Sequence, residues 1–275
     1  MSRLRLACQE QLLPGTTLQA KWETAQVYGF DAIELRGKAD GVFAARLGEL
    51  EVARADGVAM SSVCVDMSHF LGAFDAALRR DALDQMRQQL TTIAAIGGAL
   101  AVTPASYGMF SRRLPPFEPP RSAEEDRRVL VDGFGELAEH AQAHGVLICL
   151  EPLNRYEDHM VNTLAQAVDI CVAVGSPAMG VCADIYHMNI EEADVAEALV
   201  AAGDWLRHVQ VSDSNRLEPG AGHVDWAAAL AALRQRGFDA PLAYECRLSG
   251  VTDVVLPRST AFMRERAASG THRAT

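Results

Sequence analysis

The sequence predicts a single α/β barrel, in which eight parallel strands alternate with eight or more helices. Eight short apolar segments are separated by longer segments of helical periodicity. The length of 275 residues fits one such barrel, which usually takes roughly 200–250 residues. An open doubly wound sheet is the alternative, but the Gly-rich phosphate loop that normally follows its first strand is absent from the sequence. We therefore expect residues 1–275 to form one domain.

The expected strands are short apolar runs. In chain order they are Leu4–Cys8, Ala32–Leu35, Ala59–Val65, Ala99–Thr103, Val146–Leu150, Gly180–Ala183, His208–Val211 and Leu242–Tyr244. The segments between them show the spacing of amphipathic helices. Two apolar stripes make this clear: Leu83, Met86, Leu90 and Ile93, and Leu130, Phe134, Leu137 and Ala141. Glycines such as Gly145 and Gly175 stand where such helices would end.

Two segments depart from this regular alternation. The segment Pro104–Arg121 carries five prolines and follows the fourth strand, on the side of the barrel where active sites lie. It is equally compatible with a lid over the active site and with a rigid surface loop. Near the end of the chain, Thr252–Arg266 is expected to be the last helix, and Ala267–Thr275 is expected to be a loose tail.

Composition narrows the classes of function. The formal net charge is −11, and the sequence contains no Lys/Arg block of the kind that binds nucleic acid. No run approaches roughly 18 consecutive apolar residues, so a membrane span is not expected. The first residues do not resemble a signal peptide, which predicts a cytoplasmic protein. The six cysteines form no CxxC pair, and we expect them to be reduced thiols.

Polar residues follow or end the last four expected strands. Glu151 follows the fifth strand, Asp184 the sixth and Glu245 the eighth, while Gln210 lies at a comparable height on the seventh. Catalytic groups of such barrels come from these strand ends. Carboxylates that converge repel one another unless something neutralises them. Three carboxylates and one amide oxygen are the donors that Mn²⁺ or Mg²⁺ prefers, so the sequence predicts one divalent metal site.

Four ordered motifs carry a resemblance to a known family. They are Glu151-Pro-Leu-Asn-Arg-Tyr-Glu157, Asp184-Ile-Tyr-His-Met-Asn-Ile-Glu-Glu192, Asp213-Ser-Asn-Arg216 with Pro219-Gly220, and Tyr244-Glu245. With them the chain resembles the sugar isomerase/epimerase superfamily of xylose-isomerase-like TIM barrels. The first two motifs are most similar to those of the D-tagatose and D-psicose 3-epimerases. The resemblance spans most of residues 1–250 and is strongest between residues 150 and 246.

The resemblance implies that Glu151, Asp184 and Glu245 bind one metal ion, with Mn²⁺ or Mg²⁺ expected and Co²⁺ or Zn²⁺ as alternatives. Ketose 3-epimerases have a histidine as the ligand on the seventh strand, whereas this chain has Gln210. Glutamine at this place, and the stretch Glu218-Pro-Gly-Ala-Gly222, resemble the hydroxypyruvate-isomerase branch. The motifs therefore point to two subfamilies. Members often form homodimers or homotetramers.

Several further residues have a role implied by position or resemblance. His187 is expected to bind a substrate hydroxyl, and Glu157 to accept a hydrogen bond from one. Arg216 is expected to clamp terminal substrate oxygens, or else to form a salt bridge with Asp213 or Glu218. We expect His69 to line the pocket. His208 is expected to be a hydrogen-bonded core residue, and Glu34 to lie behind the ligands or at the barrel rim.

The reaction that these residues allow is proton transfer next to a carbonyl group. We expect Glu151 and Glu245 to approach a small ketose, or a related hydroxy-carbonyl compound, from opposite sides. One removes the proton to give an enediolate, and the other returns a proton to the opposite face. A return to the adjacent carbon would give an isomer instead of an epimer. A metal-dependent dehydratase of the dehydroshikimate or inosose type is the alternative function on the same barrel.

Overall fold

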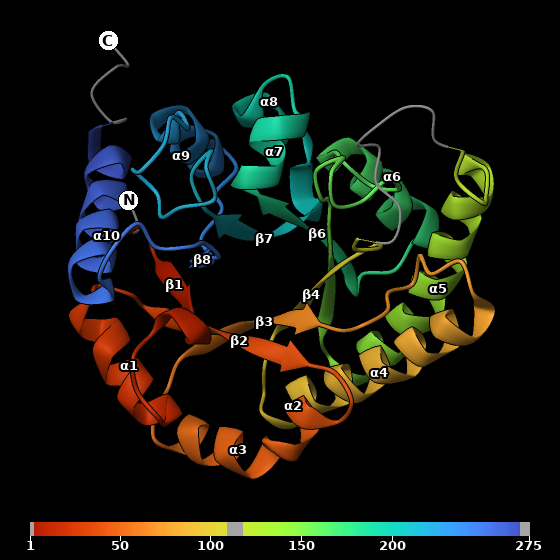
Figure 1. Cartoon of the computed structure of the whole chain (residues 1–275), viewed down its shortest axis with the longest axis horizontal. Coiled ribbons are helices and arrows are strands. Elements are labelled where there is room, and N and C mark those ends of the chain that lie inside the picture. Colours follow the sequence, from red (N-terminus) through yellow and green to blue (C-terminus); the bar gives the residue numbers. More distant parts are fainter. Residues whose placement is uncertain (1–2, 109–117, 270–275) are drawn as a thin grey trace.

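The computed structural model describes residues 3–108 and 118–269, and it forms a closed barrel of parallel strands surrounded by helices (Figure 1). Its strands are β1 Leu6–Gln9, β2 Ala32–Lys38, β3 Met60–Asp66, β4 Leu100–Pro104, β5 Leu147–Glu151, β6 Met179–Asp184, β7 Leu206–Val211 and β8 Leu242–Tyr244. Each strand pairs with the next, and β8 pairs with β1 through Leu6 and Leu242. The predicted barrel is therefore confirmed, with strand ends that differ by a few residues.

Helices follow every strand and pack on the outside of the barrel (Figure 1). The α-helices are α1 Leu18–Val27, α2 Val42–Ala45, α3 Leu47–Ala55, α4 Ala76–Ala95, α5 Ala123–His144, α6 Leu164–Val174, α7 Ile185–Glu191, α8 Val195–Ala201, α9 Trp226–Gln235 and α10 Thr252–Ser269. Two 3-10 helices, η1 Glu10–Leu12 and η2 Gly203–Trp205, complete the described elements. Among the described residues, none of these helices combines the length and the apolar character needed to cross a membrane.

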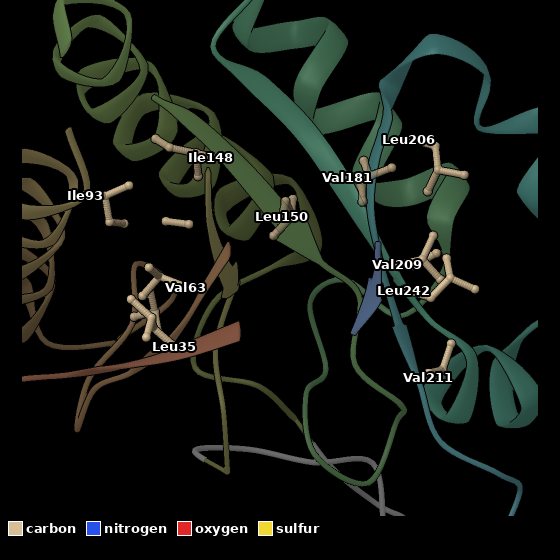
Figure 2. Close-up of a cluster of buried hydrophobic side chains, with 14 of the residues drawn as sticks. Leu35, Val63, Ile93, Ile148, Leu150, Val181, Leu206, Val209, Val211 and Leu242 are labelled. Atoms are coloured by element: carbon tan, nitrogen blue, oxygen red, sulfur yellow. The ribbon is translucent and has the colours of Figure 1, made fainter. Parts of the chain in front are cut away.

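The main hydrophobic core lies between the strands and the helices. Alternate residues of each strand point outward, and Figure 2 shows Leu35, Val63, Leu150 and Val181 in this layer. Ile93 of α4 belongs to the same core cluster. Both predicted helical stripes are buried here, which confirms them. Burial of these side chains fixes which residues of every strand face the barrel interior.

The barrel interior is lined by small and polar side chains. Ala7, Ala32 and Ala243 form one buried cluster, while Leu100, Val102, Cys149 and Cys182 form another. Gln9, Glu34, Ser62, His208 and Gln210 are buried polar residues on the strands. Within the described residues all six cysteines are unpaired, as expected for reduced thiols. These buried polar side chains lie on the same strands that carry the polar residues at the mouth of the barrel.

The structure tests part of the expected C-terminal tail but not the interpretation of the segment Pro104–Arg121. The expected loose tail at Ala267–Thr275 is wrong for its first three residues, because α10 continues to Ser269. Arg234 donates a hydrogen bond to the carbonyl oxygen of Ala267 (2.8 Å), which anchors that end of the helix. Residues 270–275 lie outside the described residues. The same holds for residues 109–117 of the segment Pro104–Arg121, so its interpretation as a lid or as a rigid loop is not tested.

Candidate active site

Five of the predicted site residues line a cavity of about 250 Å³ at the carboxyl ends of the strands. It is lined by Arg36, Cys64, Val65, Asp66, Met67, Phe70, Pro104, Tyr107, Glu151, Leu153, Glu157, His187, Arg216 and Glu245. A larger cavity of about 400 Å³ lies at the opposite end, beside Arg5 before β1 and Leu242 at the start of β8. It contains none of the predicted site residues. Active sites of this barrel lie at the carboxyl ends, so chemistry favours the smaller cavity.

Three carboxylates converge at this mouth. Glu151 ends β5, Asp184 ends β6, and Glu245 follows β8 directly. Glu151 and Asp184 are 5% and 1% exposed, so water reaches neither freely. One oxygen of Glu151, one oxygen of Asp184 and one ring nitrogen of His187 lie within 4.8 Å of one another. The ends of β5 and β6 therefore meet in the described structure, whereas Glu245 does not belong to this close group, so the predicted set of metal ligands stays a prediction.

Arg216 lies between two of these carboxylates. Its Nη1 donates to Asp184 Oδ2 and to Ser212 Oγ (3.2 Å), and its Nη2 lies 3.3 Å from Glu245 Oε2. Its guanidinium also stacks over the ring of Tyr186, with 4.8 Å between Cζ and the ring centroid. The alternative salt bridge to Asp213 or Glu218 is not found among the described residues. Arg216 thus points into the site rather than along the surface.

The loop after β7 is built to present Arg216. The Asp213 carboxylate accepts hydrogen bonds from the backbone N–H of Gly220 (2.8 Å) and from the indole N–H of Trp226 (3.0 Å). A Cβ at Gly222 would lie 2.3 Å from Asp213 Oδ1, so only glycine fits there. Arg216 itself has a positive φ of 62°, which the surrounding hydrogen bonds must hold. The Gly-rich stretch seen in the sequence therefore wraps around Asp213.

Negative charge at the mouth exceeds positive charge. Among the described residues around this cluster, the Arg216 guanidinium lies against Asp184 and Glu245, whereas Glu151 has no ion pair with an arginine or a lysine. Burial, and then the nearby Glu245 and Asp184, raise the pKa of Glu151 well above its usual range. The buried Oε2 of Glu245 receives no hydrogen bond in the described structure. One divalent cation held by carboxylate oxygens would balance this charge.

The His187 ring lies beside the same cluster, with its Nε2 facing Glu151 and Asp184. Its Nδ1 accepts hydrogen bonds from the backbone N–H (3.0 Å) and the side-chain amide (2.8 Å) of Asn154. The ring proton is therefore on Nε2, which lies 3.8 Å from Glu151 and 3.6 Å from Asp184. Burial, and then Arg216, lower the pKa of His187 to about 4, so the ring is neutral at pH 7. A protonated Nε2 has no lone pair for a metal but can donate to a substrate oxygen.

Asn154 also holds Glu157. Its amide nitrogen donates to Glu157 Oε1 (2.9 Å), and Glu157 lines the cavity, while its expected hydrogen bond with a substrate hydroxyl stays a prediction. Asn154 was not singled out from the sequence, although it lies inside the first motif, three residues after Glu151. Its function depends on contacts with α7 that only the folded chain shows.

Gln210 lies opposite Asp184 in the pairing of β6 with β7 and is fully buried. Its Nε2 donates to Glu34 Oε1 (3.0 Å), and its Oε1 accepts a weak hydrogen bond from Cys182 (3.4 Å). Because the amide nitrogen of Gln210 is bonded to Glu34, a cation could bind only to the amide oxygen of Gln210, which has one lone pair left. His208 lies 2.7 Å from Glu34 through Nε2, which confirms its expected role in the core. Glu34 lies inside the barrel rather than at its rim.

His69 is placed differently from the expectation. Its Nε2 lies 3.5 Å from the Asp81 carboxylate of α4, and it is not among the described residues that line the cavity. It follows β3 on the side of the active site, but the chain turns its side chain toward the outer helices. The cavity is reached instead by Arg36, Cys64 and Asp66, which the sequence analysis did not single out. Their signal was the two-residue spacing after inward-facing Glu34 and Ser62.

The fold and this site place the protein among known barrels. The chain belongs to the family of xylose isomerase-like TIM barrels, which matches residues 22–266. The predicted family and fold are thereby confirmed.

Particular relatives are named as epimerases, a kind of isomerase. The chain is 34% identical over 246 residues to the 3-dehydro-D-guloside 4-epimerase of Escherichia coli K12, which covers 89% of this chain and 93% of that relative. It is 38% identical over 120 residues to a D-psicose 3-epimerase of Enterocloster bolteae, covering 44% of this chain and 40% of the relative. The expectation of an isomerase is confirmed at the level of these relatives.

Solved structures agree with this placement. The crystal structure of the 3-keto-D-glucoside 4-epimerase from E. coli superposes with a TM-score of 0.90 at 32% identity, covering 96% of this chain and 100% of the other. A D-allulose 3-epimerase from Methylomonas sp., solved in complex with D-allulose, has a TM-score of 0.82 at 24% identity, covering 96% and 97% of the two chains. This second likeness concerns the fold alone.

Proposed function

We propose that this protein is a metal-dependent epimerase of keto sugars, which inverts a carbon atom next to a ketone. One observation carries the proposal: the buried carboxylate of Glu151 at the end of β5 lies with Asp184 and with Glu245, which follows β8, and Glu245 Oε2 receives no hydrogen bond among the described residues. Unpaired charge of this kind is costly for the fold and marks a functional site. The named activities of the relatives support epimerisation in particular.

The donor set fits one divalent cation. Glu151, Asp184 and Glu245 would hold it with carboxylate oxygens, and Gln210 with its amide oxygen. Oxygen donors without thiolate or free imidazole favour Mn²⁺ or Mg²⁺ over softer ions, with Co²⁺ or Zn²⁺ as weaker candidates. When bound, the ion would polarise the substrate carbonyl and make the neighbouring C–H bond more acidic.

Glu151 and Glu245 supply the proton transfers. One carboxylate removes the proton from the carbon next to the ketone, and electrons move onto the carbonyl oxygen to give an enediolate. The other carboxylate, on the opposite side of the substrate, delivers a proton to the other face of the same carbon. The configuration inverts, and no bond between heavy atoms is made or broken. Each role requires the Glu carboxylate to exchange its proton between turnovers.

His187, Arg216 and Glu157 orient the sugar. His187 offers a neutral Nε2–H donor, and Arg216 offers donors on a guanidinium that Asp184 and Ser212 already hold in place. Glu157 offers an acceptor that Asn154 fixes. Together they present donors and an acceptor to substrate hydroxyl and carbonyl oxygens. Because these side chains are already held in place before the substrate binds, they lower the barrier to the proton transfers.

Hydrogen exchange in D₂O tests the proposal. The protein is loaded with Mn²⁺ and incubated in D₂O with ketohexoses, 3-keto-glucosides and hydroxypyruvate, and products are followed by NMR. We expect an epimer with deuterium at the inverted carbon, and loss of turnover after chelation. Formation of an unsaturated product with an ultraviolet chromophore would show a dehydratase instead. Turnover without deuterium incorporation, or undiminished turnover after chelation, would contradict the proposal.

The assembly and the location of the protein stay predictions. A homodimer or homotetramer follows from the family resemblance alone, and light scattering in solution would give the mass. The cytoplasmic location rests on the sequence alone.

A further inference from the structure

The wall of the cavity formed by β2 and β3 carries a second pair of charged side chains. Arg36 lies near the end of β2, and Asp66 ends β3. Both line the cavity, and the proton transfers proposed above use neither. Side chains alternate along a strand, so Arg36 faces inward two residues after Glu34. Asp66 likewise follows Ser62 and Cys64 on the inner face of β3.

This pair is open to the cavity rather than buried in a network. Arg36 Nε donates to Asp66 Oδ2 (3.2 Å), and the two side chains are 33% and 42% exposed. Among the described residues, the guanidinium makes no further hydrogen bond, which leaves its terminal N–H groups for a ligand. The backbone N–H of Arg36 donates to the buried carboxylate of Glu10 (2.7 Å), which fixes the strand end below the side chain.

The pair lies close to the reacting end of the cavity. Cys64 is the register partner of Arg36 across β2 and β3. Its Sγ lies 3.7 Å from Glu245 Oε1, so Cys64 connects Glu245 with the pair. Two apolar side chains that follow β3, Met67 and Phe70, also line the cavity. A substrate held at Glu151 and Glu245 that extended along this wall would meet one guanidinium and one carboxylate side by side.

We propose that Arg36 and Asp66 form a subsite for two adjacent hydroxyl groups of the sugar, remote from the carbon that is inverted. The inference rests on the proposed epimerase function and names its substrate class: a polyhydroxylated keto sugar long enough to reach from Glu245 to Arg36. A hydroxyl both donates and accepts, so a vicinal diol can accept from Arg36 while donating to Asp66. A three-carbon hydroxy-carbonyl compound carries no such remote diol.

Binding energy from this subsite would favour the reaction of long substrates. Hydrogen bonds to charged groups discriminate strongly, because a substrate without the partner hydroxyl leaves those groups unpaired. Contacts far from the reacting carbon can also hold the ketone in the orientation that proton transfer needs. The subsite is thus a determinant of specificity, while Glu151 and Glu245 act on the reacting carbon.

A comparison of two substrates in two variants tests the subsite. Arg36→Met keeps an unbranched apolar side chain of similar bulk near the backbone and removes the donors, and Asp66→Ala removes the acceptor. Each variant is loaded with Mn²⁺, and deuterium exchange in D₂O is measured with a ketohexose and with dihydroxyacetone. We expect kcat/KM for the ketohexose to fall roughly 10- to 100-fold. Exchange into dihydroxyacetone should stay within about twofold of wild type.

The controls separate this subsite from the function on which it rests. Arg127→Met removes an exposed ion pair with Asp169 on the outer helices and should change neither substrate. Asp66→Asn, which keeps an acceptor oxygen, should restore part of the ketohexose rate. Equal losses for both substrates, or no loss for either, would overturn the subsite. If wild type exchanges hydrogen with no sugar, the proposed function fails. The calorimetric Kd of the ketohexose, expected to be at least tenfold weaker in Arg36→Met, then still decides the subsite.

Discussion

Two buried glutamates of this barrel, Glu34 and Glu151, have opposite electrostatic surroundings. The Glu34 carboxylate accepts four hydrogen bonds, from Gln9, Ser62, His208 and Gln210. Burial alone would raise its pKa, but His208, and then the hydrogen bonds from Gln210 and Ser62, outweigh this effect and lower it. Glu151 has no comparable set of donors. Burial and two neighbouring carboxylates raise its pKa instead.

The comparison separates what holds the barrel together from what acts on a ligand. The four hydrogen bonds to Glu34 show that this fold can fully satisfy a buried carboxylate that has a structural role. At the mouth, the same chain leaves Glu151 and Glu245 undercompensated, at a cost in stability. Such a cost persists where a ligand supplies the missing charge. Substitution of single carboxylates, either hydrogen-bonded as Glu34 is or undercompensated as Glu151 is, tests this difference.

The largest effect is expected on catalysis. Glu151→Gln and Glu245→Gln keep the shape of the side chain and remove the group that carries the proton. We expect kcat to fall by roughly 10²–10⁴-fold in each variant, which a coupled epimer assay or NMR would measure. Variants that turn over at the wild-type rate would show that these carboxylates are not the acid and base.

The next effect is expected on stability, from the compensated carboxylate. Glu34→Gln places an amide nitrogen where two donors now point, and it removes the partner of His208. Loss of one member of a buried pair costs about 3–5 kcal/mol, and we expect a reduction of this size in the free energy of unfolding. Urea titration of the metal-free protein measures it. A milder control, Ser62→Ala, removes one donor and should cost about 1 kcal/mol.

The uncompensated carboxylate predicts the opposite sign. In the metal-free protein, Glu151→Gln removes a buried carboxyl group whose ionisation is opposed by burial and by two neighbouring carboxylates. We expect the free energy of unfolding to rise by about 0.5–2 kcal/mol, as is common when a functional site is relaxed. The same urea titration decides the matter. A loss of stability as large as that of Glu34→Gln would erase the distinction between the two glutamates.

The smallest effect concerns pH and a second compensated carboxylate. Burial would raise the pKa of Glu10, but hydrogen bonds from the Arg46 side chain (2.7 and 2.8 Å) and the Arg36 backbone outweigh it, so the pKa is lowered. A lowered pKa stabilises the fold above the unfolded value, and this stabilisation is lost as pH falls from about 4.5. It amounts to about 1.4 kcal/mol for each unit of lowering. Urea titrations from pH 6 to pH 3 should show a shallower loss in Glu10→Gln than in wild type.

The barrel and the carboxylates at its strand ends could be predicted because they follow local rules. Glu151, Asp184 and Glu245 end or follow apolar strands, and parallel strands bring their carboxyl ends to one face. His69 obeys the same rule of position, yet its side chain turns toward Asp81 on α4, since packing against helices decides rotamers. Asn154 and Glu34 act through partners 33 and more than 170 residues away, and no local spacing reveals such contacts. Strand alternation alone predicts that Arg36 and Asp66 face the barrel interior, once Glu34 and Ser62 are known to face inward.

A Mn²⁺ titration of the metal-free protein tests the central claim most directly. Electron paramagnetic resonance counts free Mn²⁺, so it gives the number of ions bound per chain and their affinity. The uncompensated carboxylates predict one tightly bound ion per chain in wild type, and binding weakened by at least tenfold in Glu151→Gln and Glu245→Gln. Wild-type protein that binds no ion, or variants that bind as tightly as wild type, would contradict the claim that these carboxylates share a divalent cation.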